Sequence, residues 1–246
     1  MLASSQRLGS GRMFDRIAPR YDLLNRVLSF GLDGGWRRRC ARALRLPPAA
    51  RVLDLATGTG DLAREILRQY PDAHVVALDP APRMLEVARR KLGAELARGR
   101  LALGEGGAAD IPFPDGSFDA VTIAFGIRNV PDIGAALGEM KRVTRAGGHV
   151  AVLELLEPAE GPAAGGGIVR IAARVARFHV RHVVPAIGAA LSGREEYRYL
   201  QASIRRFPPL AEFADILRQH GFETVEVRSL SFGACGLFVA THGQRT

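Results

Sequence analysis

Short apolar runs alternate with helically spaced apolar residues along most of this chain. Runs with the length and composition of buried strands lie at 52–56, 73–78, 100–103, 120–125, 149–155, 224–230 and 235–241. Apolar residues with helical spacing lie at 62–70, 82–97, 133–145 and 209–220. Continuous apolar runs separated by helices are typical of a parallel sheet that is covered on both faces. The pattern therefore predicts an α/β fold with a doubly wound sheet.

A glycine turn follows the first predicted strand. Gly58 and Gly60 permit a tight turn and a close approach of a ligand to the backbone. The helix start that follows presents free N–H groups, which suit a nucleotide, a phosphate or a carboxylate. Asp79 ends the next strand about twenty residues later, where a carboxylate can accept hydrogen bonds from both ribose hydroxyls. The pattern predicts an adenosine-type cofactor, either NAD or S-adenosylmethionine.

Two further helical regions flank this core. Residues 12–46 precede the first strand, so they can fold over the mouth of the cofactor site as a lid, or they can pack on an outer face of the sheet. Residues 159–205 form an insertion in which four arginines share one helical stripe beside an apolar stripe. The arginines are Arg170, Arg174, Arg177 and Arg181. Such a helix can lie against an anionic membrane, or it can pack on the domain with a solvated arginine face.

Composition limits the domain organisation and the partners. With 246 residues, 47% of them hydrophobic, the chain can bury one substantial core, which predicts a single domain over 1–246. Its parts are a lid at 12–46, a cofactor-binding core at 50–158, a helical insertion at 159–205 and a last helix with a terminal hairpin at 206–246. The formal net charge of +9 suits nucleic acid or an anionic membrane. Because no aromatic–basic RNA motif or basic tail is present, no nucleic-acid partner is expected.

Cysteine usage and hydropathy predict the compartment. The two cysteines, Cys40 and Cys235, lie far apart and have no metal-ligand spacing, which suits a reducing cytoplasm and predicts no metal site. No apolar stretch is long enough to span a bilayer. The predicted localisation is cytoplasmic, with a peripheral position at the inner membrane surface as an extension of that prediction.

Several motifs resemble the landmarks of class I S-adenosylmethionine-dependent methyltransferases. They are Leu53-Asp54-Leu55-Ala56-Thr57-Gly58-Thr59-Gly60-Asp61, Ile111-Pro112-Phe113, Ser117-Phe118-Asp119 and Ala146-Gly147-Gly148. More specific segments are Met13-Phe14-Asp15-Arg16-Ile17-Ala18-Pro19-Arg20-Tyr21-Asp22, Phe125-Gly126-Ile127-Arg128-Asn129-Val130 and Tyr197-Arg198-Tyr199-Leu200-Gln201-Ala202-Ser203-Ile204. Together, over residues 13–239, these segments resemble the demethylmenaquinone methyltransferase family, in which some members also methylate the ubiquinone precursor ring. The resemblance favours S-adenosylmethionine over NAD. It implies a Rossmann-like, mostly parallel seven-stranded sheet with an antiparallel last strand.

The resemblance also implies which residues form the site. The cofactor-binding residues would be Asp54, Thr57, Gly58, Thr59, Gly60, Asp61, Asp79, Met84, Gly107, Ala108 and Ala124. The substrate-binding residues would be Tyr21, Arg128, Asn129, Tyr197 and Tyr199. Two of these positions depart from the family pattern. Gly107 stands where relatives usually carry an acidic or amide residue that contacts the adenine amine, and Ala124 stands where relatives can carry a serine.

The implied reaction is C-methylation of a quinol, which needs an electron-rich ring carbon held in line with the sulfonium methyl group and shielded from water. A positive charge or a base near the ring hydroxyl enriches the neighbouring carbon. Arg128, oriented by Asn129, is the first catalytic candidate. The alternative is that Arg128 pairs with a carboxylate and only shapes its loop.

The favoured hypothesis is methylation of demethylmenaquinol. The alternatives are a methyltransferase for another aromatic or isoprenoid substrate, including the benzoquinol precursor of ubiquinone, and a non-catalytic quinone-binding protein. The predicted partners are a polyprenyl quinol, an anionic membrane contacted through the four arginines of the insertion, and a second copy of the chain in a homodimer.

Overall fold

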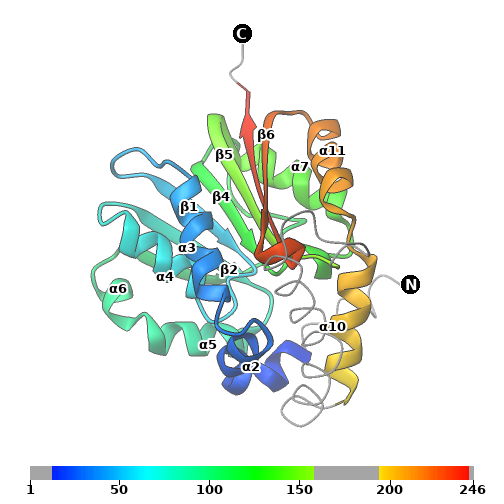
Figure 1. The fold of residues 1–246 in the computed structure, drawn as a ribbon. Coiled ribbons are helices and arrows are strands. Elements are labelled where there is room, and N and C mark those ends of the chain that lie inside the picture. The colour runs from blue at the N-terminus through cyan, green and yellow to red at the C-terminus, as the bar shows by residue number, and fades with distance from the viewer. Residues whose placement is uncertain (1–12, 158–193, 244–246) are drawn as a thin grey trace.

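The computed structural model describes residues 13–157 and 194–243, which form a twisted sheet with helices on both faces (Figure 1). The arginines of the predicted basic helix lie outside the described residues. They are Arg170, Arg174, Arg177 and Arg181.

The sheet has seven strands in the order β3-β2-β1-β4-β5-β7-β6. The strands are β1 (Arg51–Leu55), β2 (His74–Asp79), β3 (Leu101–Glu105), β4 (Phe118–Ala124), β5 (Thr144–Leu155), β6 (Phe222–Leu230) and β7 (Cys235–His242). The strands β1 to β5 pair in parallel, whereas β7 pairs antiparallel with both β5 and β6. The predicted mostly parallel, seven-stranded sheet with an antiparallel last strand is therefore confirmed.

The helices follow the predicted alternation with the strands. They are α2 (Tyr21–Leu28), α3 (Asp33–Ala43), α4 (Asp61–Gln69), α5 (Pro82–Lys91), α6 (Gly93–Ala97), α7 (Ile133–Val143), α10 (Arg194–Arg206) and α11 (Leu210–Gln219). Short 3₁₀ turns are η1 (Ala18–Arg20), η2 (Ile127–Asn129) and η4 (Ser231–Gly233). Within residues 13–157 and 194–243, none of the helices combines the length and the apolar character that crossing a bilayer requires.

Alternate residues of β1 serve opposite faces of the sheet, as the period of a strand requires. Val52 packs in a fully buried layer with Trp36 of α3 and other apolar residues of α3 and α4. Leu53 belongs to the opposite layer, which includes Met140 of α7 and Phe213 of α11. The core is thus two apolar layers with the sheet between them, and the carboxyl ends of the parallel strands meet at the edge where α2 lies (Figure 1).

The single helix predicted over 82–97 is wrong, because the structure breaks it into α5 and α6. Leu92 has φ −115° and ψ 22°, which is not helical, and its buried side chain reaches the glycine turn. A Cβ placed on Gly60 would lie 2.6 Å from Leu92 Cδ1. The side chain of Leu92 therefore occupies space that only a glycine leaves free, a tertiary contact that helical spacing does not reveal.

The fifth strand also differs from its prediction, which began at His149. β5 begins at Thr144 and includes Gly147 and Gly148, which lie between the predicted helix at 133–145 and the predicted strand at 149–155. Thr144 pairs with Phe118 of β4, and the register then shifts before Ala120 pairs with His149. A Cβ on Gly148 would lie 2.7 Å from the carbonyl oxygen of Asp119. Glycine is therefore needed here for close strand approach at an irregularity in the pairing.

Candidate cofactor and substrate site

A pocket lies where β1 and β4 end, and Tyr21 of α2 contributes to its lining. Its lining residues are Tyr21, Arg37, Asp54, Ala56, Thr57, Gly58, Thr59, Asp61, Leu62 and Ala124. A Cβ placed on Gly58 would lie 3.6 Å from Tyr21 Cε1, so the tyrosine ring lies against the glycine turn. The cavity volume is about 10 Å³, which is the room that a single water molecule needs. The Tyr21 ring therefore narrows the pocket beside the glycine turn.

Asp54 holds the glycine turn in place. Its Oδ2 accepts a hydrogen bond of 2.6 Å from the Thr57 hydroxyl, and its Oδ1 accepts one of 2.7 Å from the Thr122 hydroxyl of β4. Burial raises the pKa of Asp54 to about 6, and the two hydroxyl donors oppose this rise. Asp54 therefore links two strand ends while it contributes a carboxylate to the pocket wall.

Asp79 closes the same turn from the next strand. Its Oδ2 accepts a 2.7 Å hydrogen bond from the Gly58 N–H, and its Oδ1 accepts a 2.9 Å bond from the Ala81 N–H. Burial raises its pKa to about 6 as well, although both N–H donors favour the charged form. Each carboxylate oxygen has a second lone pair, so Asp79 can still accept hydrogen bonds from a ligand.

An ammonium group joins α2 to the glycine turn. Lys91 Nζ of α5 lies 2.6 Å from Asp22 Oδ2 of α2, 2.7 Å from Asp61 Oδ1 and 3.0 Å from Thr59 Oγ1. Thr59 also donates its hydroxyl proton to Asp22 Oδ1 at 2.5 Å. We call these four residues the Lys91 cluster. Two predicted cofactor-binding residues thus contact other helices in this structure: Thr59 contacts α2 and α5, and Asp61 contacts α5.

Arg128 lies in η2, directly after β4, and is almost fully buried. Its Nη1 donates to Glu154 Oε1 at the end of β5, and to the carbonyl oxygen of Phe125 at 2.7 Å. Its Nε donates to Ser203 Oγ of α10 at 3.3 Å. Burial raises the pKa of Glu154, and the charge of Arg128 opposes that rise. Glu154 is therefore the carboxylate expected if Arg128 pairs with an acidic side chain and only shapes its loop.

Asn129 and Tyr199, both predicted to contact the substrate, lie together. The Tyr199 hydroxyl donates to Asn129 Oδ1 at 3.2 Å, which joins α10 to η2. Burial raises the pKa of Tyr199, so this hydroxyl stays protonated and can act as a donor. Tyr197 lies in the first turn of α10, but its side chain is outside the described part of the structure.

The remaining predicted cofactor residues occupy different surroundings. Met84 is buried against Ala18 and Ala81, next to the ring of Tyr21. Gly107 forms an isolated bridge with Asp110 beyond β3, and a Cβ on Gly107 would meet no atom within 4 Å. Ala108 is buried in the core layer with α7, and Ala124 lines the pocket. The open space at Gly107 shows that a larger side chain there would fit.

Two residues of the site were missed in the sequence. Arg37 of α3 is a buried cation that lines the pocket, and Lys91 is the centre of the Lys91 cluster beside α2. Arg37 stands in a run of three arginines, of which Arg38 and Arg39 are exposed, and no local signal separates them. The one sequence signal for Arg37 was Asp33, its ion-pair partner, which lies four residues earlier at the spacing that brings side chains together on a helix.

Comparison with known proteins identifies related chains. Residues 2–242 match the model of the ubiE/COQ5 methyltransferase family. The demethylmenaquinone methyltransferase of Deinococcus radiodurans is 45% identical over 228 residues, which cover 92% of this chain and 90% of the relative. The enzyme of the same name from Thermus thermophilus is 45% identical, over 92% of this chain and 98% of its own. A ubiquinone/menaquinone biosynthesis C-methyltransferase of Syntrophotalea carbinolica is 44% identical, over 92% and 91%.

Solved structures share the fold at lower identity. A SAM-dependent methyltransferase from Aquifex aeolicus superposes with a TM-score of 0.58 and 18% identity, over 83% of this chain and 88% of that one. Phosphoethanolamine N-methyltransferase 2 of Haemonchus contortus, in complex with S-adenosyl-L-methionine, superposes with a TM-score of 0.59 and 15% identity, over 83% of this chain and 52% of that one. These similarities support the architecture of the sheet and helices.

Proposed function

Because the chain belongs to the ubiE/COQ5 methyltransferase family, we propose that it transfers a methyl group from S-adenosylmethionine to a ring carbon of a polyprenyl quinol. Demethylmenaquinol is the proposed substrate, since two of the relatives at 45% identity are named demethylmenaquinone methyltransferases. The observation that carries the proposal is the pocket at the ends of β1 and β4, with carboxylates, a glycine turn and the Arg128 site along one edge of the sheet.

The pocket residues fit the cofactor chemically. Asp79 lies at the end of β2 with spare acceptor capacity, which suits the two ribose hydroxyls. Asp54 and Asp61 line the pocket with carboxylates, which suit the positively charged amino group. The glycine turn, held by Asp54 and Asp79, lets the backbone approach the ligand closely. When bound, S-adenosylmethionine supplies an electrophilic methyl group.

The Arg128 site is proposed to act on the ring oxygen of the quinol. A new bond joins the methyl carbon to the ring carbon, the bond from sulfur to methyl breaks, and the ring carbon loses its proton to a base. In the described part of the chain, the hydrogen bonds of Arg128 use Nε and Nη1. Nη2 therefore remains to stabilise a developing quinolate oxygen. Asn129 and Tyr199 add an amide and a hydroxyl beside it.

The experiment is single-turnover transfer of labelled methyl from S-adenosylmethionine to chemically reduced demethylmenaquinone, run beside the demethylated benzoquinol precursor of ubiquinone. Label in the naphthoquinol alone is expected. Label in both quinols would extend the substrate class. Binding of S-adenosylmethionine without label in either would favour a different aromatic or isoprenoid substrate, and no binding would favour a non-catalytic protein.

A substitution of Arg128 tests whether this residue takes part in the reaction. Arg128→Lys keeps the charge but loses the fork of N–H donors, so we expect its transfer rate to fall by about 10- to 100-fold with little change in cofactor affinity. Arg142→Lys is the matched control, because Arg142 pairs with Glu139 and Asp115 on the protein surface. Equal rates in the two variants would remove Arg128 from the reaction.

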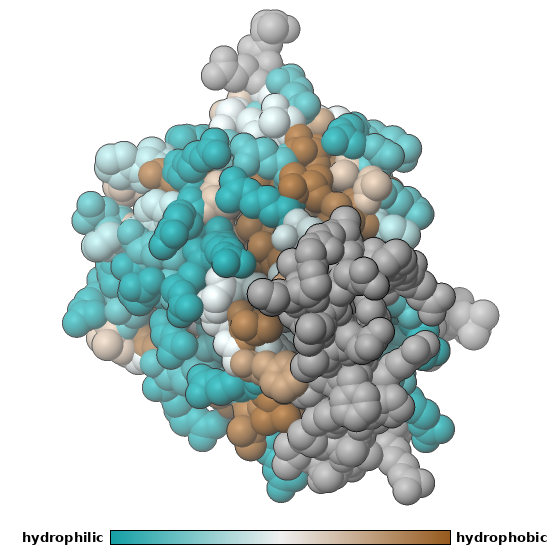
Figure 2. All heavy atoms as spheres, in the orientation of Figure 1, coloured by the Kyte–Doolittle hydropathy of each residue, from teal (hydrophilic) through white to brown (hydrophobic). Residues whose placement is uncertain are grey.

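A membrane surface is the proposed location of the substrate. Leu23, Leu32 and Phe232 are about half exposed, at 53%, 46% and 56%. Apolar residues gather on the face that carries α2 and η4, amid a mostly hydrophilic surface (Figure 2). Exposed apolar side chains on a protein with a net charge of +9 suit the surface of an anionic bilayer.

Sedimentation with anionic lipid vesicles tests this location. Leu32→Glu combined with Phe232→Glu is expected to reduce the bound fraction, and so is replacement of the four insertion arginines by glutamine. Those arginines are Arg170, Arg174, Arg177 and Arg181. Unchanged sedimentation in both variants would exclude a membrane-binding role for these residues.

A further inference from the structure

Arg37 is a buried arginine whose guanidinium reaches the pocket. It lies on α3, is 6% exposed, and pairs through Nη1 with Asp33 one helical turn earlier. Its Cζ lies 5.1 Å from the centroid of the Phe125 ring, at the end of β4. Both contacts hold the planar group in one orientation at the wall of the pocket.

The charges around the pocket are unequal. Of the described residues that line it, Asp54 and Asp61 carry carboxylates, and Arg37 is the one cation. The positive charge of Lys91 lies nearby but contacts the carboxylates of Asp22 and Asp61. A ligand with one negative and one positive group on the same carbon would therefore find a partner of opposite charge for each.

The guanidinium also has donors left over. An arginine carries five N–H protons in a planar fork that matches a carboxylate. Within residues 13–157 and 194–243, the hydrogen bond from this side chain goes to Asp33 through Nη1. The remaining donors belong to a residue that lines the pocket, and in the described part of the chain none of them is a buried atom without a partner, so they are accessible to an anionic ligand at this wall.

We infer that Arg37 binds the α-carboxylate of the amino-acid part of S-adenosylmethionine. The inference rests on the proposed function for the identity of the cofactor. It assigns a role to α3, since that helix delivers a cation to a pocket formed otherwise by strand ends and the lid. The competing role is structural: Asp33 also accepts a 3.0 Å hydrogen bond from Ser29 at the end of α2, so Arg37 could serve only to join these helices.

Calorimetric titration with two ligands separates these roles. S-adenosylmethionine and decarboxylated S-adenosylmethionine differ by the carboxylate alone, so their affinity ratio reports on that group. We expect the native protein to prefer S-adenosylmethionine by about 10- to 100-fold, which is typical of a charge-assisted, two-pronged hydrogen bond. In Arg37→Gln the ratio should fall to near one, while the affinity for the decarboxylated ligand stays within a few-fold.

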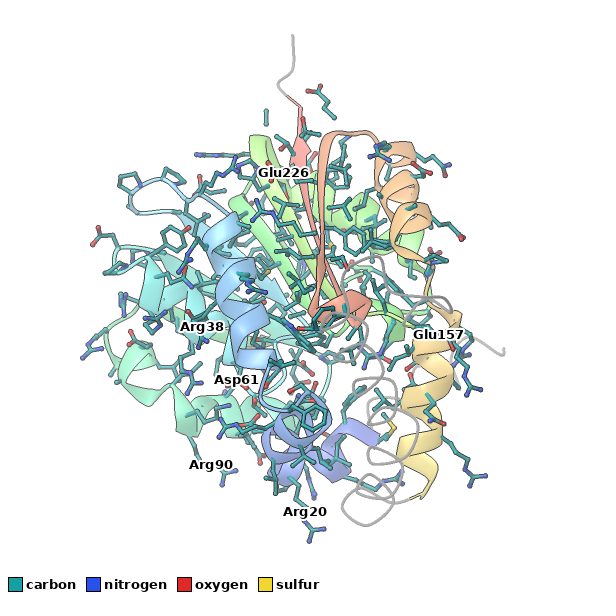
Figure 3. All side chains as sticks on the ribbon, viewed as in Figure 1. Arg20, Arg38, Asp61, Arg90, Glu157 and Glu226 are labelled. Carbon is teal, nitrogen blue, oxygen red and sulfur yellow. The ribbon has the colours of Figure 1, made fainter. Side chains whose placement is uncertain are left out.

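The control is Arg38→Gln, because Arg38 is the next residue on the same helix but is exposed (Figure 3). It should keep the native ratio. Arg37→Gln losing affinity for both ligands equally would overturn the inference in favour of the structural role, and so would a native ratio near one.

A second variant keeps the inference testable if the first one does not fold. If circular dichroism shows that Arg37→Gln does not fold, Arg37→Lys is used, since it keeps the charge opposite Asp33 but lacks the fork. Its ratio should fall several-fold, and an unchanged ratio would overturn the inference. Absence of S-adenosylmethionine binding by the native protein would reject the cofactor and the inference together, whereas binding with a ratio near one rejects the inference alone.

Discussion

Replacing Glu154 by glutamine should strongly destabilise the protein. The pair of Glu154 and Arg128 is almost inaccessible to solvent, with side-chain exposures of 0% and 7%. The variant would leave the charged guanidinium of Arg128 buried among neutral acceptors only: the new amide oxygen, a backbone carbonyl and a hydroxyl. Removing one member of a buried ion pair costs about 3–5 kcal/mol of the free energy of unfolding. That is a large part of the roughly 5–15 kcal/mol that stabilises a typical domain.

Urea unfolding followed by circular dichroism measures this loss. With a denaturant dependence of roughly 3 kcal/mol per molar urea for a domain of this size, the midpoint should fall by about 1–1.7 M. Asp215→Asn is the control, because Asp215 pairs with Arg218 on the exposed face of α11, at 64% and 52% exposure. An exposed pair contributes at most about 1 kcal/mol, so the control midpoint should move little.

The double variant Arg128→Met, Glu154→Gln provides a second check. Removing both charges leaves no unpaired ion, so much of the lost stability should return. A Glu154→Gln midpoint no lower than that of Asp215→Asn would refute the reasoning. A double variant that loses further stability, by as much as an independent second substitution would cost, would refute it as well.

Three further expectations follow from other parts of the site. The pKa of Asp79 is about 6 in the folded protein and near 3.9 in an unfolded chain, so the folded state holds its proton to a higher pH. This residue's contribution to stability should therefore fall by about 2 kcal/mol as the pH rises from 4 to 7. Asp79→Asn lacks that negative contribution, so its slope of unfolding free energy against pH should be more positive than that of the native protein, and an identical slope would contradict the raised pKa. Lys91→Met leaves the carboxylate of Asp22 without its ammonium partner. A half-buried contact of this kind contributes about 1 kcal/mol, so amide hydrogen exchange in α2 should become about fivefold faster, while exchange in α11 stays unchanged. Gly60→Ala puts a side chain at a φ of +82° with its Cβ 2.6 Å from Leu92 Cδ1, so thermal unfolding should show that the free energy of unfolding falls by about 2–4 kcal/mol. Leu92→Ala should be less harmful in the Gly60→Ala protein than in the native protein. Simple additivity of the two losses would show that the clash is unimportant.

Much of the architecture could be predicted because its signals are local. The buried runs that became β1, β2 and β4, and the glycines between β1 and α4, depend on neighbouring residues only. Asp54 and Asp79 could be placed at strand ends for the same reason. Their actual contacts with Thr122 and Gly58 required the pairing of the sheet.

The missed features depend on distant segments. Lys91 contacts Asp22 and Asp61, which lie 69 and 30 residues away in the chain. Burial of Arg37, but not of its neighbour Arg38, depends on how α3 rotates against α4 and the sheet. No periodicity of the chain specifies that rotation. The division of the helix at Leu92 likewise follows from the contact of that side chain with Gly60.

The Lys91 cluster has a consequence for residence time in the pocket. Its ammonium joins α2, the glycine turn and α5, so α2 cannot move away from the turn without separating opposite charges. Any ligand exchange that requires α2 to move must therefore wait for that separation. Dissolved salt weakens contacts between partly exposed charges, so ionic strength should set the pace of this exchange. The protein, and not the ligand alone, then determines how long each nucleoside stays.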